Sequence, residues 1–264
     1  MIRVGIGGWT FEPWRGTFYP KGLRQADELH FASRAVTAIE VNGTFYGSQK
    51  PESFRKWREQ APDGFVFALK GTRYAVNRKV LATAGESVTR FVESGISELG
   101  DKLGPINWQL AGTRRFDAED IEAFLDLLPK EIDGLPLRHV LEVRHESFRD
   151  PAFIILLRKY GVAGVVADSP KYPLIADVTA DFVYARLQDA QEDIETGYSA
   201  EALAKWAKRA ATWADGGEPD DLARATEKKP AKKKREVFIF MINGAKVRAP
   251  AAAMALIAQI GSKS

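Results

Sequence analysis

Eight short β-rich runs recur along the chain, and their regular spacing constrains the fold more than any other feature. The runs are 2–8, 37–42, 65–70, 104–110, 138–144, 162–168, 182–187 and 237–243. Most are separated by segments whose apolar residues recur at three- and four-residue spacing, most clearly 87–101, 117–128, 150–160, 200–214 and 249–260. Strands that alternate with helices form parallel βαβ units, and eight such units close into a (β/α)₈ barrel.

Residues suited to helix N-caps precede three of the expected helices, at Asp117, Asp150 and Ser199. The connection 168–181 carries two prolines, so it is too broken for a full sixth helix. The alternative is an open doubly wound sheet, which would carry a Gly-rich phosphate loop after its first strand. The segment 5–9, GIGGW, lacks that spacing. The 264 residues therefore predict a single α/β domain over 1–264, a TIM-type (β/α)₈ barrel with an incomplete sixth helix.

The chain has no cysteine, which excludes disulfides, zinc-thiolate sites, iron–sulfur clusters and cysteine nucleophiles. Its three histidines are too few to favour a multi-histidine metal centre. The chain starts directly with a strand-like run, and no apolar run approaches the ~20 residues of a membrane helix. We therefore expect a cytoplasmic protein without a membrane partner. No P-loop, G-x-S-x-G or H-E-x-x-H motif is present.

Residues 217–236, GEPDDLARATEKKPAKKKRE, are first acidic and then basic, and they carry almost no apolar side chains. Such a stretch cannot bury enough surface to order itself, so it predicts a flexible charged insertion in the barrel. The alternatives are a localisation signal or a nucleic-acid patch, although the stretch has no aromatic residue to stack on bases. As a helix-to-strand connection it belongs on the face opposite a barrel active site.

Side chains alternate between the two faces of a strand, and in a barrel one face packs against the helices. In the fifth run Leu141 and Val143 share one face, so Glu142 and Arg144 are expected to point inward. The same reasoning turns a polar or charged residue inward on six other strands. These residues are Glu40, Asn42, Lys70, Asn107, Gln109, Asp168, Arg186 and Asn243. Together they would line the mouth at the carboxyl ends of the strands, where barrel enzymes keep their active sites.

Three acids and three bases in this mouth suggest chemistry. Arg144 and Arg186 can grip a carboxylate or phosphate through their paired N–H groups, with Lys70 as a third cation. A carboxylate whose pKa is raised by burial can act as general acid or base. The alternative is a structural salt-bridge network that fills the barrel. Carboxylates also suit Mg²⁺ or Mn²⁺, but the neighbouring cations argue against a metal, and no cofactor is predicted.

Aromatic residues gather after the first three runs, where they would wall a pocket for a sugar or a base. From this group Trp9 and Tyr46 join the candidate site. The candidate catalytic residues are then Glu40, Lys70, Glu142 and Asp168. The candidate substrate-binding residues are Trp9, Asn42, Tyr46, Gln109, Arg144, Arg186 and Asn243.

Several segments also match a known pattern. They are 6–9 (IGGW), 14–20 (WRGTFYP), 39–46 (IEVNGTFY), 65–70 (FVFALK), 103–105 (LGP), 141–147 (LEVRHES), 167–169 (ADS) and 183–187 (VYARL). In this combination the chain resembles the YecE-like proteins, grouped as domain of unknown function 72, over about residues 2–257. The resemblance implies a (β/α)₈-type barrel and brings no established reaction with it.

The chain departs from that family's pattern at the rim of the barrel. The family tends to Thr-His where this chain has Val76-Asn77, to Arg-Leu-His-Gly where it has RLQD at 186–189, and to Phe-Asp-Asn-Asp where it has MING at 241–244. An Asn usual in the final helix is replaced near Ala252. If the family uses these histidines and aspartates as proton carriers, the resemblance implies altered or lost activity here. The inner charges are kept, so an anion-binding cavity would survive without catalysis.

We therefore expect an enzyme, or a protein derived from one, that binds a small phosphorylated or carboxylated molecule. Its reaction would be acid–base chemistry of the lyase, isomerase or hydrolase kind. The alternative is a non-catalytic protein that binds a small anion or nucleic acid. A titrating carboxylate with a perturbed pKa would favour catalysis, because binding needs only the cations.

Overall fold

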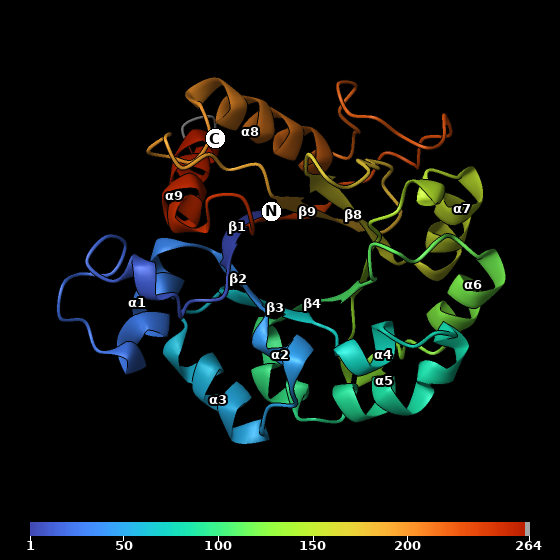
Figure 1. Ribbon diagram of the computed structural model, residues 1–264, viewed down its shortest axis with the longest axis horizontal. Coiled ribbons are helices and arrows are strands. Elements are labelled where there is room, and N and C mark those ends of the chain that lie inside the picture. The colour runs from blue at the N-terminus through green and yellow to red at the C-terminus, as the bar shows by residue number, and fades with distance from the viewer. Residues whose placement is uncertain (262–264) are drawn as a thin grey trace.

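Eight parallel strands close into a barrel in the order β1-β10-β9-β8-β7-β4-β3-β2, which confirms the predicted (β/α)₈ architecture (Figure 1). The computed structural model describes residues 1–261. The barrel strands are β1 (Ile2–Gly7), β2 (Ala38–Val41), β3 (Val66–Lys70), β4 (Leu103–Gln109), β7 (His139–Glu142), β8 (Ala163–Asp168), β9 (Phe182–Leu187) and β10 (Glu236–Met241). A small antiparallel pair, β5 (Glu131–Ile132) and β6 (Leu135–Pro136), stands outside the barrel.

Helices surround the barrel (Figure 1). They are α1 (Glu28–Ala35), α2 (Gly43–Tyr46), α3 (Pro51–Gln60), α4 (Arg73–Val76), α5 (Gly85–Val92), α6 (Ala118–Asp126), α7 (Pro151–Tyr160), α8 (Ala200–Ala214) and α9 (Ala249–Gly261). The side chains of Asp117, Asp150 and Ser199 accept N-cap hydrogen bonds, as predicted. Residues 169–181 form no helix, which confirms the incomplete sixth unit.

The helix expected over 87–101 is interrupted in the structure. α5 ends at Val92, and a 3₁₀ helix, Ile96–Lys102, follows. Gly95 lies between them as the N-cap of the 3₁₀ helix, with φ at 101°, a left-handed conformation that glycine adopts readily. The apolar spacing therefore identified the helical segment but not its break.

Large aromatic side chains from β9 and β10 fill the barrel interior, and small residues on β1 and β2 make room for them. Phe240 pairs in register with Gly5, and Gly5 pairs with Ala38 on the other side. A Cβ atom at Gly5 would lie 2.1 Å from the Ala38 carbonyl oxygen and 3.0 Å from a Phe240 ring carbon. Phe238 and Tyr184 complete this packing. Apolar side chains therefore fill the barrel interior beneath the mouth.

The inward orientation predicted for Asp168 and Asn243 is wrong. Register places Ala167 and Phe240 beside the inward Arg186, whereas Asp168 and Met241 pair with Leu187, which packs outside the barrel. Both faces of β8 and β10 are buried, so neither strand shows the polar–apolar alternation on which the prediction relied.

The charged stretch before β10 has two parts. Its acidic half is packed, because the buried Glu218 accepts a hydrogen bond from the Val178 N–H, and Asp177 accepts from the main chain of residues 225 and 226. This half is therefore not the fully solvated loop that its composition predicts. The lysines Lys228, Lys229, Lys232, Lys233 and Lys234 are exposed. The stretch enters β10 at the end where the strands begin, away from the mouth.

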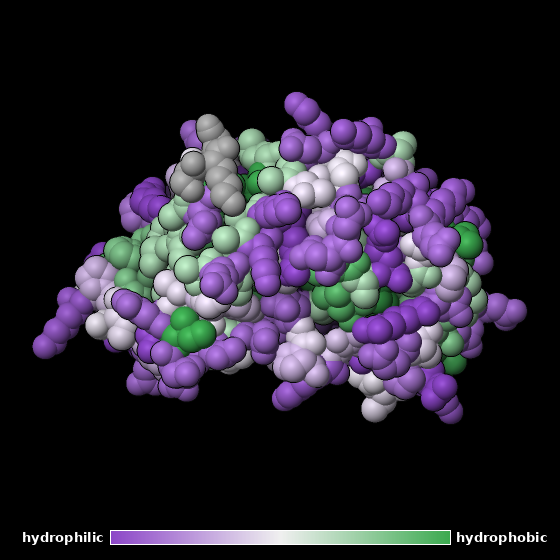
Figure 2. Space-filling view, turned by 90° about the horizontal axis from the view of Figure 1, so that it is seen from above, coloured by the Kyte–Doolittle hydropathy of each residue, from purple (hydrophilic) through white to green (hydrophobic). Residues whose placement is uncertain are grey.

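Hydrophilic side chains cover most of the face shown in Figure 2, with smaller hydrophobic patches between them. Among residues 1–261, no helix combines the length and the apolar character needed to cross a bilayer.

The buried His139 supports the outer layer of the barrel in its neutral form. Its Nε2–H donates to the Pro129 carbonyl oxygen at 2.7 Å, and its Nδ1 accepts from the Trp108 indole N–H at 3.1 Å. Burial lowers the pKa of His139 to about 4. Because the unfolded imidazole binds its proton near pH 6.5, stability should be complete above that pH and decline as the pH falls toward 4.

Protonation of His139 in the unfolded state should lower the unfolding free energy by up to about 3 kcal/mol between pH 6.5 and pH 4. Urea unfolding of the wild type and of His139→Gln at pH 7 and pH 5 checks this. The variant should lose the part of the pH dependence that His139 contributes. If the wild type and His139→Gln lose the same unfolding free energy between pH 7 and pH 5, the lowered pKa of His139 is contradicted.

Candidate functional site

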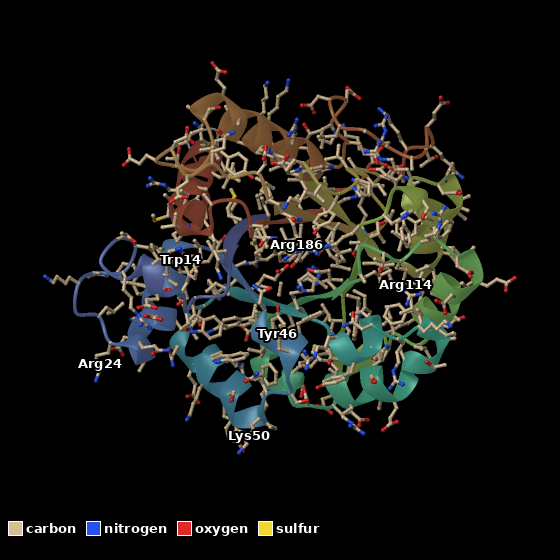
Figure 3. All side chains as sticks on the ribbon, viewed as in Figure 1. Trp14, Arg24, Tyr46, Lys50, Arg114 and Arg186 are labelled. Atoms are coloured by element: carbon tan, nitrogen blue, oxygen red, sulfur yellow. The ribbon has the colours of Figure 1, made fainter. Side chains whose placement is uncertain are left out.

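Arg186 is the centre of a buried charge cluster at the mouth of the barrel. It reaches inward from β9 and is labelled near the middle of the barrel in Figure 3. Its Nη2 donates to Glu40 Oε1 of β2 at 2.9 Å, and its Nη1 donates to Glu142 Oε2 of β7 at 2.5 Å. The side chain is 2% exposed, so its guanidinium is not accessible to a ligand in solvent. The expected ligand contact at Arg186 is thus replaced by an internal bridge between two carboxylates.

Two neutral donors and a second arginine also donate to these two carboxylates, and Asn107 shares Glu142 Oε2 with Arg186. The Tyr184 hydroxyl donates to Glu40 Oε2 at 2.6 Å, and Asn107 Nδ2 donates to Glu142 Oε2 at 3.1 Å. Arg144 Nε donates to Glu142 Oε1 at 2.9 Å. Burial opposes ionisation of Glu142, but the nearby cations outweigh it and hold the pKa of this carboxyl below its ordinary value. A raised carboxyl pKa, expected for a general acid, is therefore absent at Glu142.

Lys70 is the cation of this cluster that has no carboxylate partner among the described residues. It ends β3, is 6% exposed, and donates from Nζ to Gln109 Oε1 at 2.7 Å. The ammonium also lies 4.5 Å from the centre of the Phe45 ring. Burial and repulsion from Arg186 lower the pKa of Lys70 to about 8, despite attraction from Glu40 and Glu142. Lys70 therefore titrates close to neutral pH.

Arg144 lies at the solvent edge of the cluster. Its side chain is 16% exposed, and Nη1 donates to the Tyr172 hydroxyl at 3.2 Å. The guanidinium also stacks over the Tyr172 ring, with 4.4 Å between its carbon and the ring centre. Tyr172 comes from the irregular 169–181 connection, so no periodic pattern in the sequence pointed to it. Tyr184 was identifiable, because it shares the inward parity of Arg186.

Asp168 lies outside the barrel, away from this cluster. The side chains that act on it are Asp189, Tyr198, Trp206 and Arg209, from the segment after β9 and from α8. Burial and the charge of Asp189 raise its pKa. The structure gives Asp168 no position from which it could act together with Glu40 and Glu142.

The other candidate residues are divided between a neighbouring cavity and the surface. Trp9 and Asn42 line a cavity of about 330 Å³ together with Trp57, Gln49 and Lys246. Trp9 packs edge-to-face on Trp57, with 5.2 Å between ring centres. Tyr46 is 64% exposed on α2, and Asn243 is exposed after β10. The ligand-binding roles of all four stay predictions.

Among residues 1–261, no three His, Asp or Glu side chains form a group able to hold a metal ion. The oxygens of Glu40 and Glu142 already accept hydrogen bonds from Arg186, Tyr184 and Arg144. Such a donor-saturated pair of carboxylates does not form a cation-binding ligand set.

Comparisons with other proteins agree with the resemblance seen in the sequence motifs. The sequence profile of a family described as "Protein of unknown function DUF72" matches residues 3–264. The chain belongs to the DUF72 family. The UPF0759 protein YecE of Escherichia coli K12 is 30% identical over 151 residues, which are 56% of this DUF72 chain and 50% of YecE. The match therefore spans about half the length of this curated relative.

Solved structures of DUF72 proteins share the fold along the whole chain. A DUF72 family protein from Thermotoga maritima MSB8 superposes with a TM-score of 0.72 at 23% identity, covering 100% of this chain and 98% of the other. One from Enterococcus faecalis V583 superposes with a TM-score of 0.70 at 16% identity, covering 99% and 96%. At these identities the likeness shows the fold alone.

Proposed function

We propose that this DUF72 chain is an enzyme that acts on a small anionic molecule at the barrel mouth. The observation that carries the proposal is the Lys70 amine, which lies among buried charges without an acidic partner of its own. With a pKa of about 8, this amine can both accept and donate a proton near neutral pH. Lys70 therefore takes the acid–base role first expected of a carboxylate.

Arg144 is the residue best placed to bind the anionic group. It keeps solvent access, and Glu142 and Tyr172 hold its guanidinium in one orientation. The cluster contains two acids, Glu40 and Glu142, and three bases, Lys70, Arg144 and Arg186, so its formal charge favours an anion while Lys70 is protonated. Arg186 acts as a positioning residue, because it fixes both carboxylates. A proton on the substrate next to the bound anionic group would move to or from Lys70 Nζ, as in a lyase, isomerase or hydrolase.

Replacing Arg144 by glutamine should weaken binding of the anionic ligand about 10- to 100-fold, the scale of one lost charge-assisted hydrogen bond. A panel of phosphorylated and carboxylated sugars and hydroxy acids, screened by thermal shift on the wild type, supplies the ligands. Calorimetric titration then measures their affinity for Arg144→Gln, and NMR follows their turnover.

The matched control for that experiment is Arg149→Gln. Arg149 follows the same strand, but its side chain is 47% exposed and pairs with the exposed Glu146. We expect the affinity of Arg149→Gln for the same ligands to stay within twofold of the wild-type affinity. A panel without a single binder, or equal losses in the two variants, would overturn the assignment of Arg144.

A second function, non-catalytic binding of nucleic acid, is favoured by a different cavity. A cavity of about 950 Å³ lies between the loops after β3 and β4, and Arg78, Lys79, Arg114 and Arg115 line it. Among the described residues, the side chains of Lys79 and Arg115 have no ion-pair partner. Fluorescence anisotropy with a labelled oligonucleotide would show salt-dependent binding that Arg115→Glu abolishes. Absence of binding at low salt would remove this function.

A further inference from the structure

Two lysines of this chain are equally buried but differently held. Lys70 and Lys102 are each 6% exposed. Lys102 Nζ donates to two main-chain carbonyl oxygens, those of Arg58 at 2.8 Å and Ala61 at 2.6 Å. Lys70 Nζ donates to the single amide oxygen of Gln109. Lys102 Nζ thus has two main-chain acceptors, whereas Lys70 Nζ has one side-chain acceptor and is poorly satisfied as a cation.

The groups that face Lys70 come from four elements of the barrel. Arg186 of β9 shares the Gln109 oxygen, to which its Nη1 donates at 3.4 Å, so a second cation lies beside the amine. Glu40 of β2 and Glu142 of β7 attract the ammonium, but each already binds Arg186. Arg144, two residues after the end of β7, adds further repulsion. A desolvated lysine beside another cation is an arrangement that activates an amine as a nucleophile.

We propose that Lys70 Nζ forms an imine with an aldehyde or ketone that also carries a carboxylate or phosphate group. The inference rests on the proposed function, since it uses the same mouth and the same anion-binding residue, Arg144. It narrows the substrate to carbonyl compounds and changes the role of Lys70 from proton carrier to nucleophile.

The step balances without an oxidant or a reductant. The nitrogen lone pair attacks the carbonyl carbon, and the π electrons of the C=O bond move to oxygen. A proton passes from nitrogen to that oxygen and gives a carbinolamine. The nitrogen lone pair then expels the hydroxyl group, which takes a proton from solvent at the mouth and leaves as water. The iminium nitrogen returns its own proton to solvent and becomes the neutral imine. One amine and one carbonyl thus give one imine and one water.

The protonation state of Lys70 agrees with this chemistry. With a pKa of about 8, about a tenth of the amine is neutral at pH 7. An exposed lysine, with a pKa near 10.4, is neutral in fewer than about one molecule in a thousand at that pH. Imine formation with a small carbonyl compound should therefore select Lys70 over the exposed lysines.

Reductive trapping with glyoxylate, an aldehyde that carries a carboxylate, tests the proposal. The full chain is incubated with glyoxylate and sodium cyanoborohydride, digested, and mapped by mass spectrometry. The expected result is one carboxymethyl group on the peptide that contains Lys70, at ten or more times the occupancy of Lys102 or the exposed Lys50. Labelling should increase between pH 6 and pH 8.5 as the amine loses its proton.

Two variants test whether the label depends on the Lys70 amine. Lys70→Arg should lose the label, and Lys102→Arg should keep it on Lys70. If Lys70→Arg does not fold, the peptide map of the wild type still decides. A label spread over exposed lysines with no enrichment at Lys70 overturns the inference.

Failure of the inference and failure of the proposed function give different results. Equal trapping of acetaldehyde, which has no anionic group, supports the imine and removes the anion-binding role of Arg144. No label at Lys70, while panel compounds still bind through Arg144, overturns the imine and leaves the proposed function standing.

Discussion

Replacing Arg186 by methionine should lower the unfolding free energy by about 3–5 kcal/mol at pH 7, the usual loss when one partner of a buried ion pair is removed. The guanidinium separates Glu40 and Glu142 and bonds to both. Methionine fills a similar volume but leaves two buried carboxylates without their common cation. Urea unfolding at pH 7 measures the loss. The matched control is Arg55→Met, because Arg55 pairs with Glu98 at the surface and should contribute less than about 1 kcal/mol.

The pH dependence gives this prediction a second test. In the wild type the pKa of Glu142 is below its ordinary value, so its contribution to stability is present above about pH 4.5 and is lost as the pH falls below that value. Without Arg186, burial should raise the pKa of Glu142, which then takes up a proton at a higher pH. The difference between wild type and variant should therefore shrink from pH 7 to pH 5. A constant difference, or a loss below 1 kcal/mol, would contradict the bridging role of Arg186.

Replacing Lys70 by methionine should have the opposite effect and stabilise the fold by about 2 kcal/mol at pH 7. The pKa of Lys70 falls from 10.5 to about 8 on folding, so holding the ammonium in the cluster costs about 3 kcal/mol, and its bond to Gln109 returns about 1 kcal/mol. The same variant should lose glyoxylate trapping. A functional residue that lowers the stability of its own fold is expected of an active site.

The sign of the Lys70 effect can be checked by pH and by comparison with Lys102. Because the pKa of Lys70 is lower in the folded state, wild-type stability should rise between pH 8 and pH 9.5, and Lys70→Met should lose that rise. Lys102→Met leaves the carbonyl oxygens of Arg58 and Ala61 without their donor, so it should destabilise by about 1–3 kcal/mol. If Lys70→Met and Lys102→Met lose similar amounts of unfolding free energy, Lys70 is an ordinary structural lysine.

The sequence predicts the inner face of the barrel well where a strand mixes polar and apolar residues. Leu141 and Val143 alternate with Glu142 and Arg144, and only one orientation puts the apolar pair against the helices. In β8 both faces are apolar up to Asp168, so only this terminal residue indicated which face points inward. The inward orientation predicted from it was wrong. That carboxylate instead lies near Trp206 and Arg209 of α8.

The partners of the charges could not be predicted from the sequence. Parity brings Arg186, Arg144 and Lys70 to one mouth, but it does not say which cation neutralises which carboxylate. Side-chain reach decides this, because Arg186 lies far enough inside to bond Glu40 and Glu142 at once, whereas Lys70 ends beside Gln109. The functional role that we propose therefore rests on the lysine without an acidic partner, and the most buried arginine serves to position the carboxylates.

The bridge from Glu40 through Arg186 to Glu142 joins residues that are 146 and 44 positions apart in the chain. A cut between β4 and β7 would place Glu40 on one fragment and both of its bridge partners on the other. The N-terminal half would then expose Glu40 without Arg186, and the C-terminal half would expose Arg186 with one of its two carboxylate partners. This barrel should accordingly not act as two independent half-barrels, and its halves should regain native structure only when mixed.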